Sequence, residues 1–343
     1  MKRLTLLASA AAFAALAFIG TASASTLTDV QGRGVVTCGV NGPTGLTGFG
    51  IPDDKGNWTG LDVDLCRAIA AAVFGDATKV KFVPLGSKER FTALQSSEID
   101  VLVRNSTWTY ARDTELGLDF VAVNYYDGQG FLVRKELGVK SAKELSGATI
   151  CVQTGTTTEK NLADYFRVNN LELKQPPTFE NADQARQAYD EGRCDAYTTD
   201  ASGLASERTQ LKNPGDNIIL PEIISKEPLG PVVRHGDNNW GDIVRWSYFA
   251  MLIAEEKGIT QGNVDQIKTS TQDAEVRRLL SLDDDWGKKM GLSKDWAYNI
   301  IKQVGNYGES FERNVGQKTP LGLARGLNEL WSKGGLQYAP PFN

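Results

Sequence analysis

Three polar segments of this chain carry side chains that could bind a charged small molecule, and each follows an apolar run typical of a β-strand. The first, residues 104–112, offers hydroxyl groups in close succession and then Arg112. An arginine can bind a carboxylate through two parallel hydrogen bonds, which a lysine cannot do. The simpler alternative is a hydroxyl that caps a helix beside a surface arginine, and this segment taken alone fits that alternative better.

The second segment, residues 153–159, places Gly155 and a row of threonines after another apolar run. Glycine permits a tight turn, and the N-terminus of the helix that follows exposes unpaired N–H groups that favour an anion. Thr156 and Glu159 also fit a capping box, which is the structural alternative. No Gly-Lys-Ser/Thr follows, so the segment is not a P-loop and a nucleotide site is poorly supported.

The third segment ends at Asp200, directly after the strand-like residues 195–199. A carboxylate at the end of a strand could receive an ammonium group, although the capping of a short helix over residues 201–209 also explains it. Each of the three signals is weak by itself. Together they provide an arginine and a helix N-terminus for a carboxylate and an aspartate for an amine, which is the complement of a free α-amino acid.

The elements that must position these residues follow the order of an α/β protein, in which β-branched runs alternate with helical stretches. Open α/β sheets bind ligands at the carboxyl ends of their strands, where the three segments lie. In a first series we predict strands at 35–40, 80–84 and 99–103 and helices at 63–74 and 88–96. In a second series we predict strands at 148–153 and 195–199 and helices at 158–169 and 182–191.

Extended stretches at residues 120–134 and 228–234 separate the two series and predict a middle lobe inserted into the first. We expect lobe 1 to span residues 25–132 and 233–343 and lobe 2 to span residues 133–232, with two crossing strands at the hinge. An added C-terminal helical segment is expected, with helices at 240–256, 271–280, 296–304 and 321–331. Its tryptophans are expected in the core, namely Trp286, Trp296 and Trp331.

The N-terminal residues have the pattern of a signal peptide. Lys2 and Arg3 precede a short, alanine-rich apolar run over residues 4–19, and Ala22-Ser23-Ala24 supplies the small residues that a signal peptidase recognises. A membrane anchor is the alternative, but the run is short and the cleavage signature follows at once. We therefore expect residues 1–24 to be removed by cleavage near Ala24 and the chain to be exported.

Composition excludes several classes of function. A formal net charge of −5 argues against a nucleic-acid surface. The single histidine, His235, excludes a multi-histidine metal site, and we expect it at the surface.

In an oxidising compartment four cysteines predict two disulfides. The element order favours the pairs Cys38–Cys66 and Cys151–Cys194 among three connectivities.

The sequence resembles the periplasmic amino-acid-binding proteins of ABC importers, and among them the general L-amino-acid-binding subgroup. The family motifs are GLDVDL at 60–65, ALQSxxID at 93–100, TxTxxR at 107–112, YYxG at 125–128, GTT at 155–157 and RCDA at 193–196. Strings closer to the subgroup are PDDKGNW at 52–58, NYYDGQG at 124–130 and DDWG at 284–287. The likeness extends over the whole mature chain and implies a two-lobe, type II-like periplasmic binding protein.

By this resemblance, Arg112 binds the α-carboxylate of the ligand with help from Thr107 and the backbone of Thr157. Asn105 offers a backbone carbonyl to the ammonium group, and Asp200 pairs with that group.

The family usually covers its ligand with an aromatic ring after the first strand. Here the glycine-rich stretch 42–50 occupies that place, and Phe49 is the candidate ring. Thr156 and Tyr126 complete the expected set of ligand contacts.

The resemblance implies a monomeric periplasmic protein that captures free L-amino acids of broad range between two closing lobes and delivers them to a membrane permease. No cofactor, metal or catalytic residue is expected. The alternative is an enzyme on the same scaffold, such as a cyclohexadienyl-type dehydratase, which needs a general acid in the cleft. The unassigned carboxylates there are Asp127 and Glu159, and both have plain loop or cap interpretations.

Overall fold

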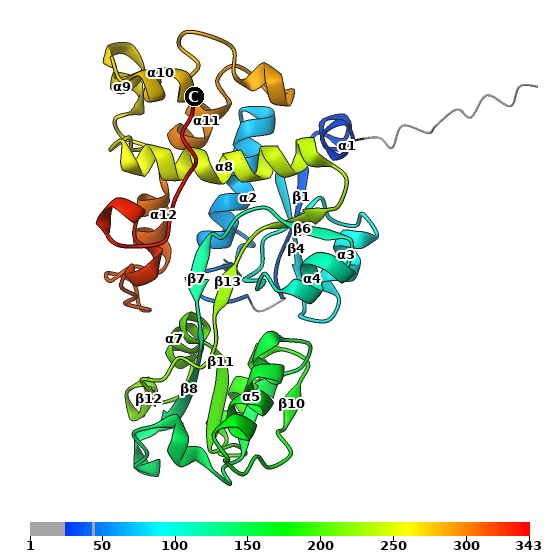
Figure 1. Cartoon of the computed structure of the whole chain (residues 1–343), viewed down its shortest axis with the longest axis vertical. Helices are drawn as coiled ribbons and strands as arrows, with labels where there is room; N and C mark the ends of the chain where they lie inside the picture. Colours follow the sequence, from blue (N-terminus) through cyan, green and yellow to red (C-terminus); the bar gives the residue numbers. More distant parts are fainter. Residues whose placement is uncertain (1–24, 43–44) are drawn as a thin grey trace, which may run out of the picture.

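The computed structural model describes residues 25–42 and 45–343, which form two lobes joined by a pair of crossing strands (Figure 1). The expected signal peptide, residues 1–24, lies outside the described residues. None of the helices in the described ranges is both long enough and apolar enough to cross a bilayer.

The sheet of the first lobe has the strand order β4-β1-β5-β14-β6. β1 lies between β4 and β5 and pairs with both in parallel, and all six of its residues are buried because helices cover the sheet. The helix α2 (Leu61–Phe74) packs on β1 and against α8 (Asn238–Glu256). The strands are β1 (Val36–Asn41), β4 (Val80–Leu85), β5 (Val101–Leu102), β6 (Leu118–Phe120) and β14 (Val232–Arg234).

Three shorter helices complete this part of the lobe, namely α1 (Thr26–Arg33), α3 (Arg90–Gln95) and α4 (Tyr110–Glu115). A small hairpin pairs β2 (Ile51–Pro52) with β3 (Trp58–Thr59).

The second lobe also contains a five-stranded sheet, with the strand order β10-β9-β11-β8-β12. Its strands are β8 (Gln129–Arg134), β9 (Ile150–Gln153), β10 (Thr178–Phe179), β11 (Ala196–Asp200) and β12 (Asn217–Ile219). Its helices are α5 (Thr157–Val168), α6 (Ala182–Asp190) and α7 (Ala201–Thr209). In both sheets three neighbouring strands run parallel, so their carboxyl ends share one edge.

Two short strands carry the chain between the lobes, β7 (Tyr125–Asp127) outward and β13 (Glu227–Leu229) on the return (Figure 1). They pair with each other in antiparallel fashion. The boundary expected between residues 132 and 133 falls inside β8, whose residues pair with β11 and β12 of the second sheet. The pairing therefore places the first crossing a few residues earlier, at Gly128.

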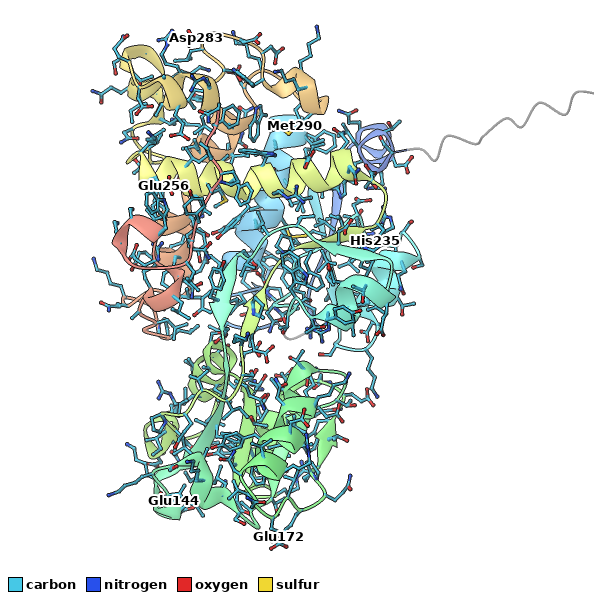
Figure 2. The ribbon with its side chains drawn as sticks, in the orientation of Figure 1. Glu144, Glu172, His235, Glu256, Asp283 and Met290 are labelled. Atoms are coloured by element: carbon cyan, nitrogen blue, oxygen red, sulfur yellow. A yellow bond between two sulfur atoms is a disulfide. The ribbon has the colours of Figure 1, made fainter. Side chains whose placement is uncertain are left out.

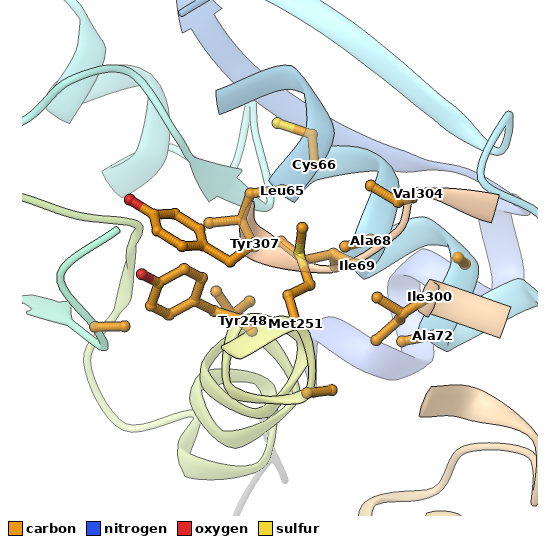
Figure 3. Packing of buried hydrophobic residues seen from close by; sticks show 14 of the residues in the cluster. Leu65, Cys66, Ala68, Ile69, Ala72, Tyr248, Met251, Ile300, Val304 and Tyr307 are labelled. Atoms are coloured by element: carbon orange, nitrogen blue, oxygen red, sulfur yellow. The ribbon is translucent and has the colours of Figure 1, made fainter. Parts of the chain in front are cut away.

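The C-terminal helices pack on the first lobe as one core with α2 and α8 (Figure 3). Ile69 of α2, Met251 of α8, Ile300 and Tyr307 meet there, all nearly or fully buried. The helices are α9 (Val264–Ser270), α10 (Ala274–Leu279), α11 (Trp296–Gln303) and α12 (Tyr307–Asn314).

The helix expected over residues 321–331 is wrong. Gly322 and Gly326 adopt left-handed φ values of +62° and +51°, and the chain forms only short 3₁₀ turns at Gly326–Asn328 and Trp331–Lys333. Trp331 is consequently 53% exposed, whereas Trp296 is buried as expected. The sequence reasoning missed α12, which begins with a capping box between Asn306 and Glu309.

Both predicted disulfides are confirmed, and each lies within one lobe. Cys38 on β1 is bonded to Cys66 on α2, and Cys151 on β9 is bonded to Cys194 just before β11. His235 lies on the surface as predicted, beside Asp119, and is 46% exposed (Figure 2).

Candidate functional site

A cavity of about 280 Å³ lies between the two lobes, at the carboxyl ends of all six parallel strands. This is where open α/β sheets bind ligands. The first lobe contributes the residues at or just after the ends of β1, β4 and β5, which include Asn41, Ser87 and Asn105. The second lobe contributes the ends of β9, β10 and β11, which include Gln153, Glu180 and Asp200.

The two lobes touch at the mouth of this cavity. The Nζ atom of Lys88 lies 2.9 Å from Oε1 of Glu180 in the second lobe. Gly155 turns with φ +74°, and a Cβ atom there would lie 3.1 Å from Cγ of Lys88. Glycine at this turn therefore permits both the tight bend and the close approach of the lobes.

Asp200 lies in the cavity wall at the end of β11 and is only 6% exposed. Its Oδ2 atom lies 3.5 Å from Nδ2 of Asn105, across the cleft. It stands at the N-cap position of α7 without accepting a capping hydrogen bond, so capping does not explain its side chain. Burial is the main cause that raises the pKa of Asp200 well above its usual value, and the nearby carboxylates of Asp127 and Glu227 raise it further.

Arg112 lies on α4, and its Nη1 atom donates to the carbonyl of Thr107 at 2.9 Å. Its guanidinium also stacks over the ring of Phe91 at 5.1 Å. The hydroxyl of Thr109 caps α4, which is the capping role that the sequence suggested for this segment. Thr107 lines the cavity, whereas Arg112 does not line it and contacts it through the hydrogen bond to Thr107.

The N-terminus of α5 closes another side of the cavity through Thr156 and Thr157. Thr156 is the N-cap, accepting from the N–H of Glu159 at 3.2 Å, while its own hydroxyl donates to the carbonyl of Gln153. The carboxylate of Glu159 accepts from the N–H of Gly155 at 2.9 Å. Thr156 therefore caps the helix as predicted, but the capping box is incomplete, because Glu159 accepts from Gly155 rather than from the N–H of Thr156. The first N–H groups of the helix remain available to an anion.

Glu227, which the sequence reasoning missed, joins the two lobes from the crossing strand β13. It is fully buried, and its Oε2 atom accepts from the hydroxyls of Thr107 at 2.6 Å and Thr157 at 2.9 Å. Its Oε1 atom accepts from Asn161 and Ser225. The two threonine hydroxyls therefore point to Glu227 rather than into the cavity. A charged residue directly before the second extended stretch was the signal that could have revealed it.

Two arginines of the first lobe, Arg90 and Arg104, also line the cavity and were missed. Both are buried, and burial lowers the pKa of each, to about 10 for Arg104. Arg104 donates to the carbonyl of Leu85 and to the hydroxyl of Ser87. Arg90 falls inside a predicted helix with no local motif, so nothing in the sequence distinguished it from a surface arginine.

Besides Arg112, two other expected contact residues do not line the cavity. Phe49 is fully buried in the core of the first lobe, edge-on to the ring of Tyr125 at 5.2 Å between centroids. Its backbone carbonyl accepts hydrogen bonds from the N–H groups of Asp62 and Val63 at the start of α2, and these bonds hold the residue in this inward position. Tyr126 lies on β7, where its N–H and carbonyl bond the side chain of Asn328. The aromatic residue that lines the cavity is Tyr197 of β11.

Comparison with known proteins gives consistent matches. Residues 38–279 match the family described as bacterial extracellular solute-binding proteins, family 3. The chain is 64% identical to the glutamate/glutamine/aspartate/asparagine-binding protein BztA of Rhodobacter capsulatus, over 94% of this chain and 95% of that protein. It is 63% identical to the general L-amino acid-binding periplasmic protein AapJ of Rhizobium johnstonii, over 98% of each.

A solved structure is also similar over nearly the whole length. The periplasmic binding protein of an ABC transporter from Brucella ovis, with glutathione bound, is 59% identical, with a TM-score of 0.91. The match covers 93% of this chain and 100% of that one.

Proposed function

The chain belongs to the bacterial extracellular solute-binding proteins of family 3, and from that premise we propose that it captures free L-amino acids in the cavity between its lobes. It would act in the periplasm as the binding component of an ABC importer, after cleavage of the signal peptide near Ala24. The relatives named above are binding proteins, and they favour this function over the dehydratase alternative.

The observation that carries the proposal is the state of Asp200. Among the described residues, this buried carboxylate has no cation within 4 Å and only the long contact with Asn105. A buried charge is costly unless it is paired, and Asp200 faces a cavity large enough for a small molecule. The ammonium group of an amino acid supplies the missing partner, and the carbonyl of Asn105 would accept a second hydrogen bond from it.

The α-carboxylate would then lie at the N-terminus of α5, near Thr157 and Thr107, where free N–H groups and the positive end of the helix favour an anion. Arg112 stands one residue behind Thr107 and adds positive charge on that side. The carbonyl of Thr107 engages one Nη1 donor, and the other donors of the guanidinium would be available to the carboxylate.

Capture would proceed by closure of the lobes about β7 and β13. Lobe 1 comprises residues 25–128 and 230–343 in this proposal, and lobe 2 comprises the residues between them. Closure removes water from the charged pairs and strengthens them, so bound ligand stabilises the closed form. A membrane permease would recognise that closed form of a monomeric binding protein.

Isothermal titration of ligand-stripped protein with a panel of L-amino acids tests the proposal, together with Asp200→Asn. We expect one-to-one binding of several amino acids and a loss of about 30-fold or more in the variant, because an ammonium group would be left without its charged partner. Asp164→Asn is the matched control, since that carboxylate lies on the same lobe but is exposed and paired only with Arg167. Absence of binding by every amino acid, or full affinity in Asp200→Asn, would overturn it.

A further inference from the structure

We propose that the C-terminal segment of the chain holds the crossing strand β7 and so positions the hinge for ligand capture, with Asn328 as the positioning residue. The segment extends beyond residues 38–279, which match the family, so the family match does not account for it. Its final part lies beside β7 (Figure 1). The inference rests on the proposed function, because amino-acid affinity is one of its readouts.

Asn328 binds the backbone of β7 through both ends of its side-chain amide. Its Oδ1 atom accepts from the N–H of Tyr126 at 2.6 Å, and its Nδ2 atom donates to the carbonyl of Tyr126 at 3.0 Å. Asn328 is only 3% exposed. In the described part of the chain β13 is the one strand that pairs with β7, and the amide of Asn328 takes the place of a second strand on the other edge.

Tyr307 makes a second contact with the same crossing. It begins α12 and is 1% exposed, and its hydroxyl donates to the carbonyl of Asn124 at 2.9 Å. Asn124 directly precedes β7, and its own side chain donates to Asp62 on α2 at 3.0 Å. Asn328 and Tyr307 together form a clasp that fixes the outgoing strand where it leaves the first lobe.

The clasp is attached firmly to the long helix α8. The guanidinium of Arg325 forms a two-pronged ion pair with Glu255 of α8, at 3.0 and 3.1 Å, and its Nε atom donates to the carbonyl of Asn328 at 3.1 Å. The same guanidinium stacks over the rings of Tyr307 and Phe311 at 5.1 and 5.0 Å. Paired geometry of this kind restrains both side chains, so Asn328 moves with the body of the first lobe.

The clasp determines where the hinge can bend. Tyr126 lies opposite Pro228 of β13, and the carbonyl of Pro228 accepts from the N–H of Trp108 of the first lobe at 2.8 Å. Both crossing strands are therefore held to the first lobe at the same register position. Bending is then confined to residues 127–128 on the outgoing strand and residues 225–227 on the return. A hinge that is ordered before the ligand arrives leaves less conformational freedom for binding to remove.

Titration and hydrogen–deuterium exchange of Asn328→Ala test the proposal. We expect affinity for each amino acid that binds the wild-type protein to fall by about fivefold or more, because closure must then also order Tyr126. In the ligand-free variant the peptide that contains residues 124–128 should exchange about tenfold faster, since the N–H of Tyr126 has lost its acceptor.

Asn314→Ala is the matched control. Asn314 is also an asparagine of the C-terminal segment, and its side chain bonds Asp64 and Ser310 within the first lobe rather than a crossing strand. We expect it to lower the free energy of unfolding while leaving affinity within about twofold of the wild-type value and the exchange of residues 124–128 unchanged.

Unchanged affinity in a folded Asn328→Ala variant would overturn the proposal, and so would an equal loss of affinity in Asn314→Ala, because the segment would then act through stability alone. Failure of every amino acid to bind the wild-type protein would instead contradict the proposed function, and the exchange measurement, which needs no ligand, would still decide on the clasp. Should Asn328→Ala not fold, Tyr307→Phe is the second variant, with faster exchange of residues 124–128 and at least about twofold weaker binding expected. Wild-type behaviour of Tyr307→Phe would contradict the proposal.

Discussion

At the scale of single residues, the cavity combines buried charges of both signs that the protein itself leaves unpaired. Asp200 lacks a cation among the described residues, and Arg90 lacks an anion. Each would be destabilising in an empty, dry site, because an unpaired charge in low dielectric loses its hydration without compensation. The ammonium group of a ligand would remove the penalty at Asp200, which would make the ligand a part of the electrostatic balance of the closed protein.

Ligand affinity is expected to fall as pH falls. Burial raises the pKa of Asp200 well above its usual range and that of its neighbour Asp127 to about 6, so the free protein holds protons here in mildly acidic solution. The ligand ammonium group requires ionised Asp200, and binding therefore releases a proton. Below the raised pKa the affinity should drop by up to about tenfold per pH unit.

Titration with L-alanine between pH 8 and pH 5 measures this effect, since the charge of alanine is constant over that range. Repeating each titration in buffers with different heats of ionisation counts the released protons. A constant affinity without proton release would show that Asp200 is already ionised in the free protein.

Residues at strand ends could be predicted from the sequence, whereas residues that depend on tertiary packing could not. Asp200, Thr157 and Asn105 follow apolar strands, and the chemistry of open sheets places such residues at the cavity. Phe49 also follows a strand, but its backbone receives the first turn of α2 and the ring turns into the core. Arg90 gave no signal, because a helix position reveals neither its burial nor the absence of its partners.

At the scale of elements, the crossing strand β13 does more than connect the lobes. Through Glu227 it accepts hydrogen bonds from Thr107 in the first lobe and from Thr157 and Asn161 in the second. The same residue thus holds the two segments that face each other across the cavity. We therefore expect Glu227 to act as a positioning residue of the hinge.

Glu227→Ala is expected to favour the open form and to lower ligand affinity by about tenfold or more, because four buried or part-buried donors lose their acceptor. Small-angle scattering should show a larger radius of gyration in subsaturating ligand, and titration should give the affinity. Glu227→Gln should lose less, since one acceptor oxygen remains. Glu222→Ala is the control, because Glu222 bonds Ser141 and Ala142 of the second lobe alone. An unchanged affinity in Glu227→Ala would contradict this role.

The C-terminal segment shows why an apolar pattern alone does not always predict a helix correctly. The strong apolar pattern of α8 and α11 predicted both helices, whereas the 321–331 stretch has a similar composition and is broken by left-handed glycines. The apolar face of α12 is spread over only two turns, so its capping box was the better signal. Periodicity indicates where a helix is possible, and the local φ values decide whether it forms.

At the scale of the whole molecule, the two disulfides are distributed like the two sheets, one in each lobe. One disulfide lies in the first lobe and one in the second, and neither joins the two. Each lobe is therefore stabilised separately while the relative orientation of the lobes stays free to change. The noncovalent contacts at the mouth of the cavity, such as Lys88 with Glu180, are exposed and reversible.

Replacing both Cys151 and Cys194 by alanine should lower the free energy of unfolding of the second lobe by about 3–4 kcal/mol, from the loop of 43 residues that the bond closes. Amino-acid affinity should change by less than about threefold, because the bond lies away from the cavity and does not restrain closure. Denaturant unfolding followed by circular dichroism and a parallel titration measure the two quantities. A fall in affinity comparable to the loss of stability would contradict the separation of lobe stability from closure.

The position of β14 sets an order for folding during export. This strand lies between β5 and β6 in the first sheet, yet it is made only after the entire second lobe. An emerging chain can complete the contiguous second lobe as soon as β12 is available, while β5 and β6 must wait for a partner more than a hundred residues away. The unpaired edges of the earlier lobe are exposed throughout that interval, so it is the first half of the chain that most needs protection from aggregation or proteolysis as it leaves the membrane.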